Sequence, residues 1–365
     1  MIKDNNRLVF VDVYKGITMF LLMAEAASLY QALDGYVPKQ GFGHFIMQQF
    51  HHHPWNGLRF WDLIQPFFMF IVGVVMPFSL KSRLKKGHSQ KAIFRHILNR
   101  CGILFLLGTG LHCVYNQKLV WELWNVLTQL SFTILVTFVL MRYPLKVQIF
   151  AFFGFLILTE ILYRGYNPEA PFVKDQNFGS WMDMVLMGKI NPGGGWVAIN
   201  CIPTASHTIL GAICGEILLS DMAINRKVRY FILAGLGGLA IGYGLDLTGI
   251  TPIVKRIATT SFVFASGGWC LLAMAFFYWI IDIRGNKKWT PFFTIVSMNS
   301  IFIYVFSETI GHQWLRGFGK IWTFGFLGFT GMSEPLLGVF NAVFVLGILW
   351  YLCYFLYQNK VFIKV

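Results

Sequence analysis

The stretch that decides the fold is residues 60–80, FWDLIQPFFMFIVGVVMPFSL, which is apolar almost throughout. Its one ionisable residue is Asp62, near the start. A helix needs about 20 consecutive apolar residues to cross a hydrocarbon core of about 30 Å. Because the apolar residues are continuous rather than alternating with polar ones, the stretch predicts a transmembrane helix and not a strand of a membrane barrel.

Stretches of the same kind recur along the whole chain. Of its 365 residues, 56% are hydrophobic and only 13% are charged, whereas soluble domains have about 45–50% and about 25%. We therefore predict an all-α fold, a polytopic membrane bundle of about ten transmembrane helices forming a single domain over residues 1–365. The expected spans are 8–30, 60–80, 101–117, 124–141, 147–164, 196–219, 231–248, 257–281, 291–310 and 337–357.

The distribution of lysine and arginine predicts the orientation of the bundle. With the N-terminus in the cytoplasm, nineteen of the thirty basic residues fall on the cytoplasmic side, seven of them between Lys81 and Arg100. Ten fall on the opposite side, although its connections are longer. This bias follows the positive-inside rule and places both termini in the cytoplasm. It also accounts for the net charge of +14, so we expect a lipid bilayer and no nucleic acid as partner.

Segments outside the spans carry few other signals. We expect no cleavable signal peptide, because the first apolar stretch is too long and too polar for one. The six cysteines lie in or beside apolar stretches without the spacing of a metal site, which indicates packing residues without disulfides. Three long outer segments, 31–59, 165–195 and 311–336, could form re-entrant turns or a lid.

Ionisable residues inside spans are costly, so each is a candidate functional residue. Asp12 and Lys15 are three residues apart in the first span. They could form a local ion pair that fixes the depth of the helix, or Lys15 could contact an anionic cofactor that enters from the cytoplasm. Further polar residues within the spans are Gln129, Glu160, His207, Glu216, Asp246, Asn299, Ser300 and Glu308.

Three consecutive histidines, His51, His52 and His53, lie between Glu25 near the end of the first span and Asp62 at the start of the second. An imidazole titrates near neutral pH, and a carboxylate partner raises its basicity, so this pattern favours general acid–base chemistry. A metal site is a weaker alternative, because consecutive histidines in an extended chain point to opposite sides. Interfacial histidines that only form hydrogen bonds are the third interpretation.

Several motifs resemble the heparan-α-glucosaminide N-acetyltransferase family, in order along essentially the whole chain. The segments around His52 and Asn299 are the specific ones. The matching segments are 7–17 (RLVFVDVYKGI), His52, 55–58 (WNGL), 62–63, 66–68, 70–73 (FIVG), 126–129 (VLTQ), 290–293 (TPFF), 298–301 (MNSI), Tyr304, Glu308 and 360–365 (KVFIKV).

The resemblance implies a membrane acyltransferase of a bacterial branch, located in the inner membrane. Family members transfer an acetyl group from cytoplasmic acetyl-CoA, as co-substrate without a metal, to the amine of a terminal glucosamine. The family's catalytic histidine stands three residues before the tryptophan, which is His52 here. With the polar residues above, we predict the catalytic residues His52, Glu25, Asp62 and Asn299 and the donor-binding residues Lys15, Asp12, Gln129, Ser300 and Glu308.

The sequence departs from the family at several of these motifs. The asparagine expected near the outer end of the first span is replaced by Ala26, and the arginine of the opening motif by Lys15. An acidic-proline-acidic-glycine turn is replaced by residues 191–195, NPGGG, and a histidine by Ser307. The resemblance therefore implies a sugar or glycan acceptor without naming it.

Other classes of function are compatible with the spans. A multispan transporter of a glycan fragment or an amphiphile is the main alternative, although the internal symmetry common in transporters is not evident. A non-catalytic scaffold fits poorly with acids beside three histidines. The glycines Gly211 and Gly215 could pack helices within the chain or in a homodimer.

Overall fold

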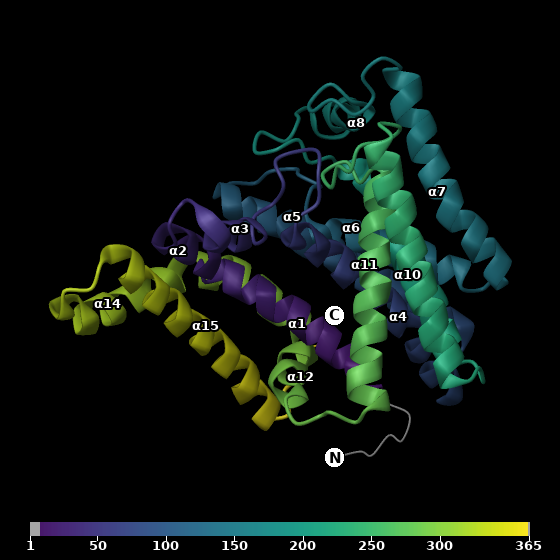
Figure 1. The fold of residues 1–365 in the computed structure, drawn as a ribbon. Helices are drawn as coiled ribbons and strands as arrows, with labels where there is room; N and C mark the ends of the chain where they lie inside the picture. The colour runs from purple at the N-terminus through teal and green to yellow at the C-terminus, as the bar shows by residue number, and fades with distance from the viewer. Residues whose placement is uncertain (1–7, 364–365) are drawn as a thin grey trace. The chain divides into compact units, whose positions relative to one another are not determined.

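The computed structural model describes residues 8–363, in which every regular element is a helix. Arg7, at the start of the opening motif, and residues 364–365, at the end of the last one, lie outside the described residues. The chain forms two compact units, each described separately (Figure 1). Unit 1 contains residues 8–52, 59–61 and 280–363, and unit 2 contains residues 53–58 and 62–279.

Unit 1 is built from the two end regions of the described chain. Its α-helices are α1 (Val9–Ala26), α2 (Leu29–Tyr36), α3 (Gly41–Gln48), α12 (Thr290–Met298), α13 (Ser300–Phe306), α14 (Arg316–Leu327) and α15 (Glu334–Gln358). A π-helix, η4 (Ser307–Leu315), joins α13 to α14. The short helices η1 (Phe60–Leu63) and η3 (Tyr278–Ile283) lie where the chain passes between the units, and η5 (Gly328–Thr330) follows α14.

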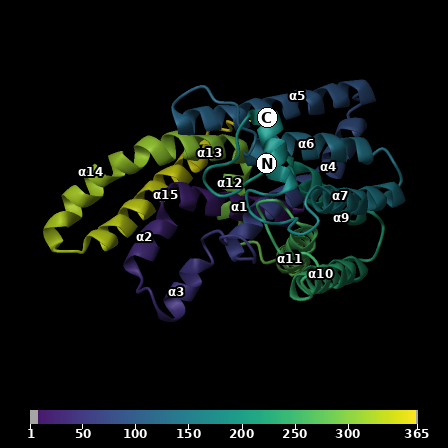
Figure 2. The ribbon, with the colours of Figure 1, turned by 90° about the horizontal axis from the view of Figure 1, so that it is seen from above.

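Unit 2 holds the middle of the chain. Its helices are α4 (Ile64–Lys85), α5 (Gln90–Asn116), α6 (Val126–Leu140), α7 (Leu145–Tyr166), α8 (Phe178–Met187), η2 (Ala198–Asn200), α9 (Cys201–Leu219), α10 (Ile224–Leu247) and α11 (Thr260–Phe277). Helices α10 and α11 lie side by side in both ribbon views (Figures 1 and 2).

The helices α4 and α9 form the buried centre of unit 2. A Cβ atom at Gly73 would overlap the Thr208 carbonyl oxygen, and one at Gly211 would overlap that of Phe70. A Cβ atom at Gly215 would lie 2.5 Å from the Val74 oxygen. Small residues therefore let the two backbones approach closely, and the Gly211–Gly215 pair serves packing within the chain.

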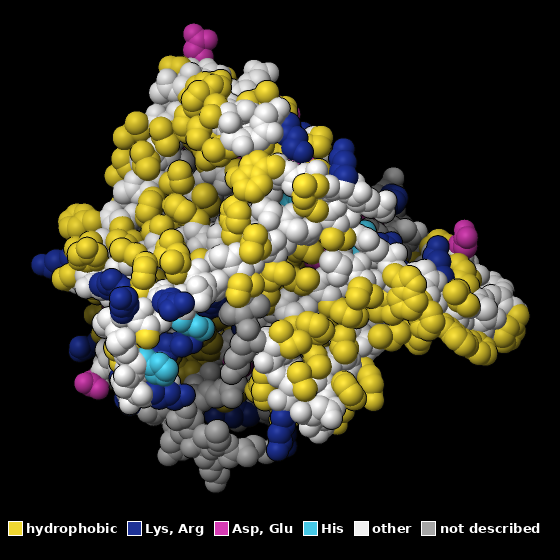
Figure 3. Space-filling model, turned by 180° about the vertical axis from the view of Figure 1, so that it is seen from behind, with side chains coloured by type: hydrophobic (Ala, Val, Ile, Leu, Met, Phe, Trp, Pro, Cys, Tyr) yellow, Lys and Arg dark blue, Asp and Glu magenta, His cyan; other side chains and the backbone are white. Residues whose placement is uncertain are grey.

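The outer helices of unit 2 present apolar side chains to their surroundings. In its most apolar window, the span containing α4 is 72% buried, whereas α7 is 22% and α10 is 17% buried. Hydrophobic side chains cover much of the face seen in Figure 3, and lysine and arginine lie mainly at its margins. Such surfaces suit a hydrocarbon surrounding.

The predicted all-helical, multispan fold is confirmed, but the count of about ten spans is not. Among residues 8–363, seven helices are long and apolar enough to cross a membrane, or eight if one bent pair counts as a span. They are Phe60–Lys85, Gln90–Asn116, Leu145–Tyr166, Ala198–Leu219, Ile224–Leu247, Thr260–Ile283 and Glu334–Gln358. At two other predicted spans, α1 contains Asp12, Lys15 and Glu25, and α6 has only 15 residues.

The predicted span 291–310 differs most from the structure. It is bent by 77° between α12 and the following helix, which extends from Ser300 to Thr330. Most of the expected outer segment 311–336 is therefore helical. Its helix α14 packs against α15, where Thr323 and Asn341 are buried and the Asn341 amide donates to the Arg316 carbonyl over 3.2 Å.

Candidate functional site

The C-terminal end of α1 carries Glu25 and holds the segment that follows α3. The indole N–H of Trp61 donates to Glu25 Oε1 over 3.1 Å, and the Trp61 backbone N–H donates to the Gln49 carbonyl over 2.8 Å. The Tyr30 ring lies 4.9 Å from the Trp61 ring and stacks on Phe50 at 4.8 Å. Within unit 1, the chain leading into the histidines is thus fixed beside Glu25.

The three histidines have different surroundings. His51 lies close enough to Asp34 to help lower the pKa of that carboxyl, after the larger effect of the hydrogen bond from Lys39. The His52 carbonyl accepts a hydrogen bond from Arg59 Nη1 over 3.2 Å. The His53 ring packs against Gly57, where a Cβ atom would lie 2.6 Å from Nε2. Across residues 8–363, no group of three or more His, Cys, Asp or Glu side chains is placed to hold a metal ion.

Asp62 is the second predicted carboxylate and lies in unit 2 with 1% of its surface exposed. Its Oδ2 accepts the backbone N–H of His53 over 3.1 Å, and its Oδ1 lies 3.8 Å from Lys255 Nζ. A buried carboxylate is stable only with such charged and hydrogen-bonding partners. Asp62 therefore holds the backbone directly after His52, and Lys255 is a partner that local sequence reasoning missed.

Asn299 lies at the break between α12 and α13 and binds backbone. Its Nδ2 donates to the Val361 carbonyl over 3.0 Å, and its Oδ1 accepts the Ile363 N–H over 2.8 Å. The neighbouring Ser297 hydroxyl donates to Asp12 Oδ1 over 3.5 Å. Asp12 and Glu25 are thirteen residues apart in α1, or about 20 Å along a helix. Asn299 therefore lies near the N-terminal end of α1, where Asp12 is, whereas Glu25 is at the C-terminal end.

The predicted donor-binding residues divide between the units. Lys15 is half-buried on α1, and Ser300 and Glu308 lie on α13 and η4, which both pack against α1. Gln129 is buried on α6 in unit 2, where its side-chain oxygen accepts a hydrogen bond from Gln65 Nε2. The structure thus groups Lys15, Ser300 and Glu308 with the rest of unit 1, while Gln129 has a separate place in unit 2.

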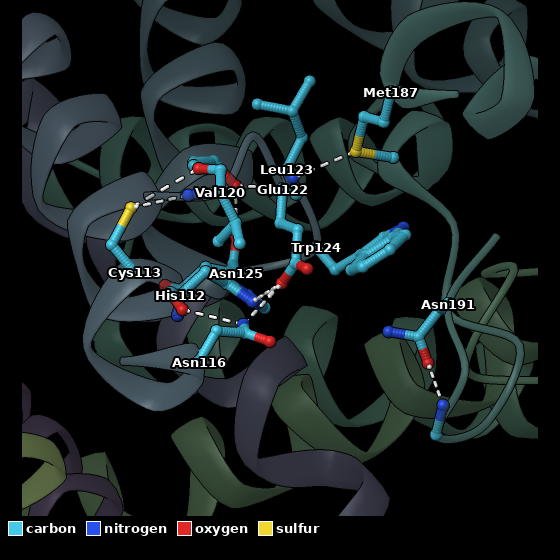
Figure 4. Close-up of polar contacts among 12 residues, drawn as sticks. His112, Cys113, Asn116, Val120, Glu122, Leu123, Trp124, Asn125, Met187 and Asn191 are labelled. Atoms are coloured by element: carbon cyan, nitrogen blue, oxygen red, sulfur yellow. Dashed lines mark hydrogen bonds and ion pairs between the residues drawn. The ribbon is translucent and has the colours of Figure 1, made fainter. Parts of the chain in front are cut away.

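A polar cluster centred on Glu122 connects α5 to the segment after α8 (Figure 4). Glu122 accepts from His112 Nδ1 and from Lys189 Nζ, both over 2.6 Å, and from Asn116 Nδ2 over 3.3 Å. Burial raises the pKa of the Glu122 carboxyl, but the hydrogen bonds from Lys189 and His112 outweigh it, and the pKa lies below its usual range. Glu122 is therefore a charged anchor for the segment that begins at Lys189.

Asp183 is a buried carboxyl whose hydrogen-bond donors are neutral. It accepts from the Trp124 indole N–H over 2.7 Å and from the Ala198 backbone N–H over 2.9 Å. Burial raises its pKa to about 6, against the opposite effect of those two hydrogen bonds. Sequence reasoning missed both Glu122 and Asp183, because their partners come from separate helices and connections.

Seven helices among residues 8–363 that are long and apolar enough to cross a membrane indicate a multi-pass helical membrane protein. No family model matches the chain. The chain is similar to heparan-alpha-glucosaminide N-acetyltransferase from Homo sapiens, with 24% identity over 428 aligned positions that cover 98% of this chain and 60% of the relative. The corresponding protein from Mus musculus is 24% identical over 431 positions, covering 99% of this chain and 61% of the relative.

These matches confirm the predicted resemblance: the chain is distantly similar to heparan-alpha-glucosaminide N-acetyltransferase over nearly its whole length. The chain spans about 60% of the length of these curated relatives. Because the similarity extends over nearly the whole chain, it includes both ends of α1 and the segment with the three histidines.

Proposed function

We propose that the chain is a membrane acetyltransferase that moves an acetyl group from acetyl-CoA to an amine or hydroxyl group of a sugar. The observation that carries the proposal is the family relationship over 98% of the chain. The position of Glu25 beside the segment that leads into the histidines supports it. The proposal includes the orientation expected from the basic residues, with the donor on the cytoplasmic side of a bacterial inner membrane.

His52 is the proposed general base. Its imidazole takes a proton from the acceptor nitrogen or oxygen while that atom attacks the thioester carbonyl. The new bond to the acetyl carbon forms, the C–S bond breaks, and the CoA sulfur leaves and receives the proton. A route through an acetylated His52 has the same donor and the same product, with the acetyl group passing over the imidazole first.

Two carboxylates support His52 in this proposal. Glu25 supplies negative charge at its end of α1 and raises the basicity of the imidazole. Asp62 acts through the main chain, because it holds the N–H of His53, the next residue. Asn299 is assigned to the backbone of residues 361–363 rather than to the oxyanion, since its amide donates to one of these residues and accepts from another.

The donor is anionic, and the chain has a basic surface that fits it. The end of α4, the turn after it and the start of α5 carry seven lysines and arginines between residues 81 and 100, without any acidic residue. This surface would attract the phosphates of CoA. Lys15, on α1 in unit 1, is proposed separately as a donor-binding residue. The complementary charges of these basic residues and of the CoA phosphates support acetyl-CoA as the donor.

The test uses purified full-length protein with radiolabelled acetyl-CoA and glucosamine as acceptor. We expect labelled N-acetylglucosamine, and a rate at least about 100-fold lower for His52→Ala, the size of a lost general base. His51→Ala is the matched control, because it removes the adjacent imidazole. Transfer by His52→Ala at the parental rate would refute the role of His52, and no transfer to any sugar would refute the proposed function.

A transporter is the second candidate, favoured by the break between α12 and α13. Interrupted helices that expose backbone groups at a substrate site are common in secondary transporters, and this pair is bent by 77°. Uptake of a labelled glycan fragment into vesicles without any consumption of acetyl-CoA would favour this candidate over the acetyltransferase.

A further inference from the structure

Four connections of unit 2 meet at one end of this unit. The Trp55 indole N–H donates to the Phe172 carbonyl over 3.0 Å, and the Gly57 N–H donates to the Ile253 carbonyl over 2.8 Å. A Cβ atom on Gly195 would lie 2.9 Å from the Trp55 ring. The segments that form this surface are 53–58, 167–177, 188–197 and 250–259.

Two adjacent cations share one aromatic ring on this surface. Lys255 Nζ lies 5.2 Å from the centre of the Trp196 ring, and the Arg256 guanidinium lies 5.7 Å from it. Lys255 is only 7% exposed, and Asp62 neutralises it in part, at 3.8 Å. Burial lowers the pKa of Arg256 despite the opposing charges of Asp62 and Asp175. Because burying cations is costly, this arrangement indicates a site for additional negative charge.

Arg256 has hydrogen-bonding capacity that the protein does not use. Its Nη1 donates to the Gly194 carbonyl, while its Nε is buried without a hydrogen-bond partner in the described part of the chain. The side-chain oxygen of Asn200 is likewise buried without a partner there, and its Nδ2 donates to the Arg256 carbonyl over 3.2 Å. The segment 188–200 contains no acidic residue. The carboxylates that act on Arg256 are those of Asp62 and Asp175, from other segments. The unused donor could therefore bind an oxyanion of a ligand.

The segment that carries Trp196 is fixed at both ends. Lys189 is bound to Glu122, and the Ala198 N–H is bound to Asp183. Near the middle, Arg256 holds the Gly194 carbonyl. The aromatic ring and the cations are thus preformed, which lowers the entropic cost of binding a ligand.

We propose that Arg256, together with Lys255 and Trp196, binds an oxyanionic substituent on the acceptor sugar: a carboxylate, a sulfate ester or a phosphate ester. The inference rests on the proposed function, because it identifies the ligand as the acceptor. Trp55, which lies on the same surface, follows the proposed base His52 by only three residues. Specificity for the acceptor is thereby assigned to residues of the segments 188–200 and 250–259.

The test compares acceptors in the purified full-length protein. The acceptors are glucosamine, glucosamine 6-phosphate, glucosamine 6-sulfate and a disaccharide of glucosamine and glucuronic acid, which separate the three anionic groups. We expect at least one anionic acceptor to have a lower KM than glucosamine. For the Arg256→Gln variant, the KM of the preferred anionic acceptor divided by the KM of glucosamine should rise about tenfold or more. A rise of this size is expected for a lost charge-assisted hydrogen bond.

Two further variants keep the test specific. Arg256→Lys retains the charge without the planar fork and should give an intermediate ratio. Lys118→Gln removes an exposed cation elsewhere in unit 2 and should leave the ratio unchanged. Thermal unfolding of each variant identifies any loss of fold, and Arg256→Lys carries the test if Arg256→Gln does not fold.

The outcomes separate this inference from the proposed function. Titration calorimetry with each sugar in the absence of acetyl-CoA measures binding without transfer. Arg256-dependent binding of an anionic sugar by a protein that transfers no acetyl group would refute the proposed function and retain the anion site. Transfer to glucosamine with no preference for any anionic acceptor, or with a preference that Arg256→Gln leaves intact, would overturn the inference.

Discussion

The two ends of α1 use polar side chains in different ways. At the N-terminal end, Asp282 accepts the N–H groups of Val9 and Phe10 over 3.1 and 2.9 Å, and Asn299 binds the backbone of residues 361–363. At the C-terminal end, Glu25 meets the indole of Trp61 beside the segment with the histidines. We therefore propose that the polar groups at the N-terminal end of α1 serve architecture, and that those at the C-terminal end, where the segment with the histidines lies, serve chemistry.

Glu25→Gln should have the largest effect at the chemical end. The amide keeps an acceptor for the Trp61 N–H, so the fold should persist, but the negative charge that we propose supports His52 is lost. We expect kcat for acetyl transfer to fall about 10- to 100-fold, measured with labelled acetyl-CoA at saturating acceptor. Asp34→Asn is the matched control in the same unit, and an unchanged kcat in Glu25→Gln would remove Glu25 from the chemistry.

Asn299→Ala should affect stability rather than catalysis. It removes a donor from Val361 and an acceptor from Ile363, so unfolding in detergent should become easier by about 1–3 kcal/mol. The rate per folded molecule should stay within about twofold of the parental rate. An oxyanion donor would instead lower kcat about 100- to 1,000-fold at unchanged stability, and that result would reverse the comparison between the two ends.

Asp183 extends the comparison to a carboxyl of unit 2 whose donors are neutral. Burial raises its pKa to about 6, so the folded state binds the proton more tightly than the unfolded state. The contribution of Asp183 to the free energy of unfolding is therefore fully present below about pH 4 and is lost as the pH rises through 6. The loss amounts to about 1–3 kcal/mol. Chemical unfolding between about pH 4 and pH 7 measures this loss.

Asp183→Asn should flatten that part of the pH profile, because no carboxyl remains to titrate at this position. If the free energy of unfolding changes with pH as steeply in Asp183→Asn as in the parental protein, another group titrates in this range. Glu122 is the natural counterpart, since its pKa is lowered and its contribution is lost instead as the pH falls through that lowered value.

Asp282→Ala should have the smallest effect. The first N–H groups of a helix lack partners within the helix, and Asp282 supplies acceptors for two of them from a distant part of the chain. Loss of such a cap costs about 1 kcal/mol. Asp282→Asn retains an acceptor oxygen and should lower the free energy of unfolding by less than Asp282→Ala does. Equal losses of stability in the two variants would mean that the negative charge of Asp282, and not its hydrogen bonds, stabilises α1.

The multispan helical fold was predictable from the sequence, because the length and continuity of apolar stretches are local properties. Prediction failed where distant residues decide the structure. Asn299, at the break between α12 and α13, binds the backbone of residues 361–363. Helix α14 continues through a segment whose glycines and basic residues suggest a loop. The cap formed by Asp282 on α1 joins residues that are 273 positions apart.

The candidate site was predicted only in part for the same reason. Glu25 and Asp62 stand out as acids within apolar stretches, whereas the choice of His52 among three histidines came from the family resemblance. Lys255 and Arg256 lie outside any motif, and only the fold brings them to Trp196. Polar contacts between separate connections leave no periodic pattern in the sequence.

The C-terminal end of α1 is where we place the chemistry, with His52 as the base. The most direct test is the single-turnover rate of acetyl transfer by His52→Ala and by Asn299→Ala, each normalised to folded protein. We predict a rate at least about 100-fold below the parental rate for His52→Ala and a rate within about twofold of it for Asn299→Ala. A parental rate in His52→Ala together with a large loss in Asn299→Ala would contradict this placement.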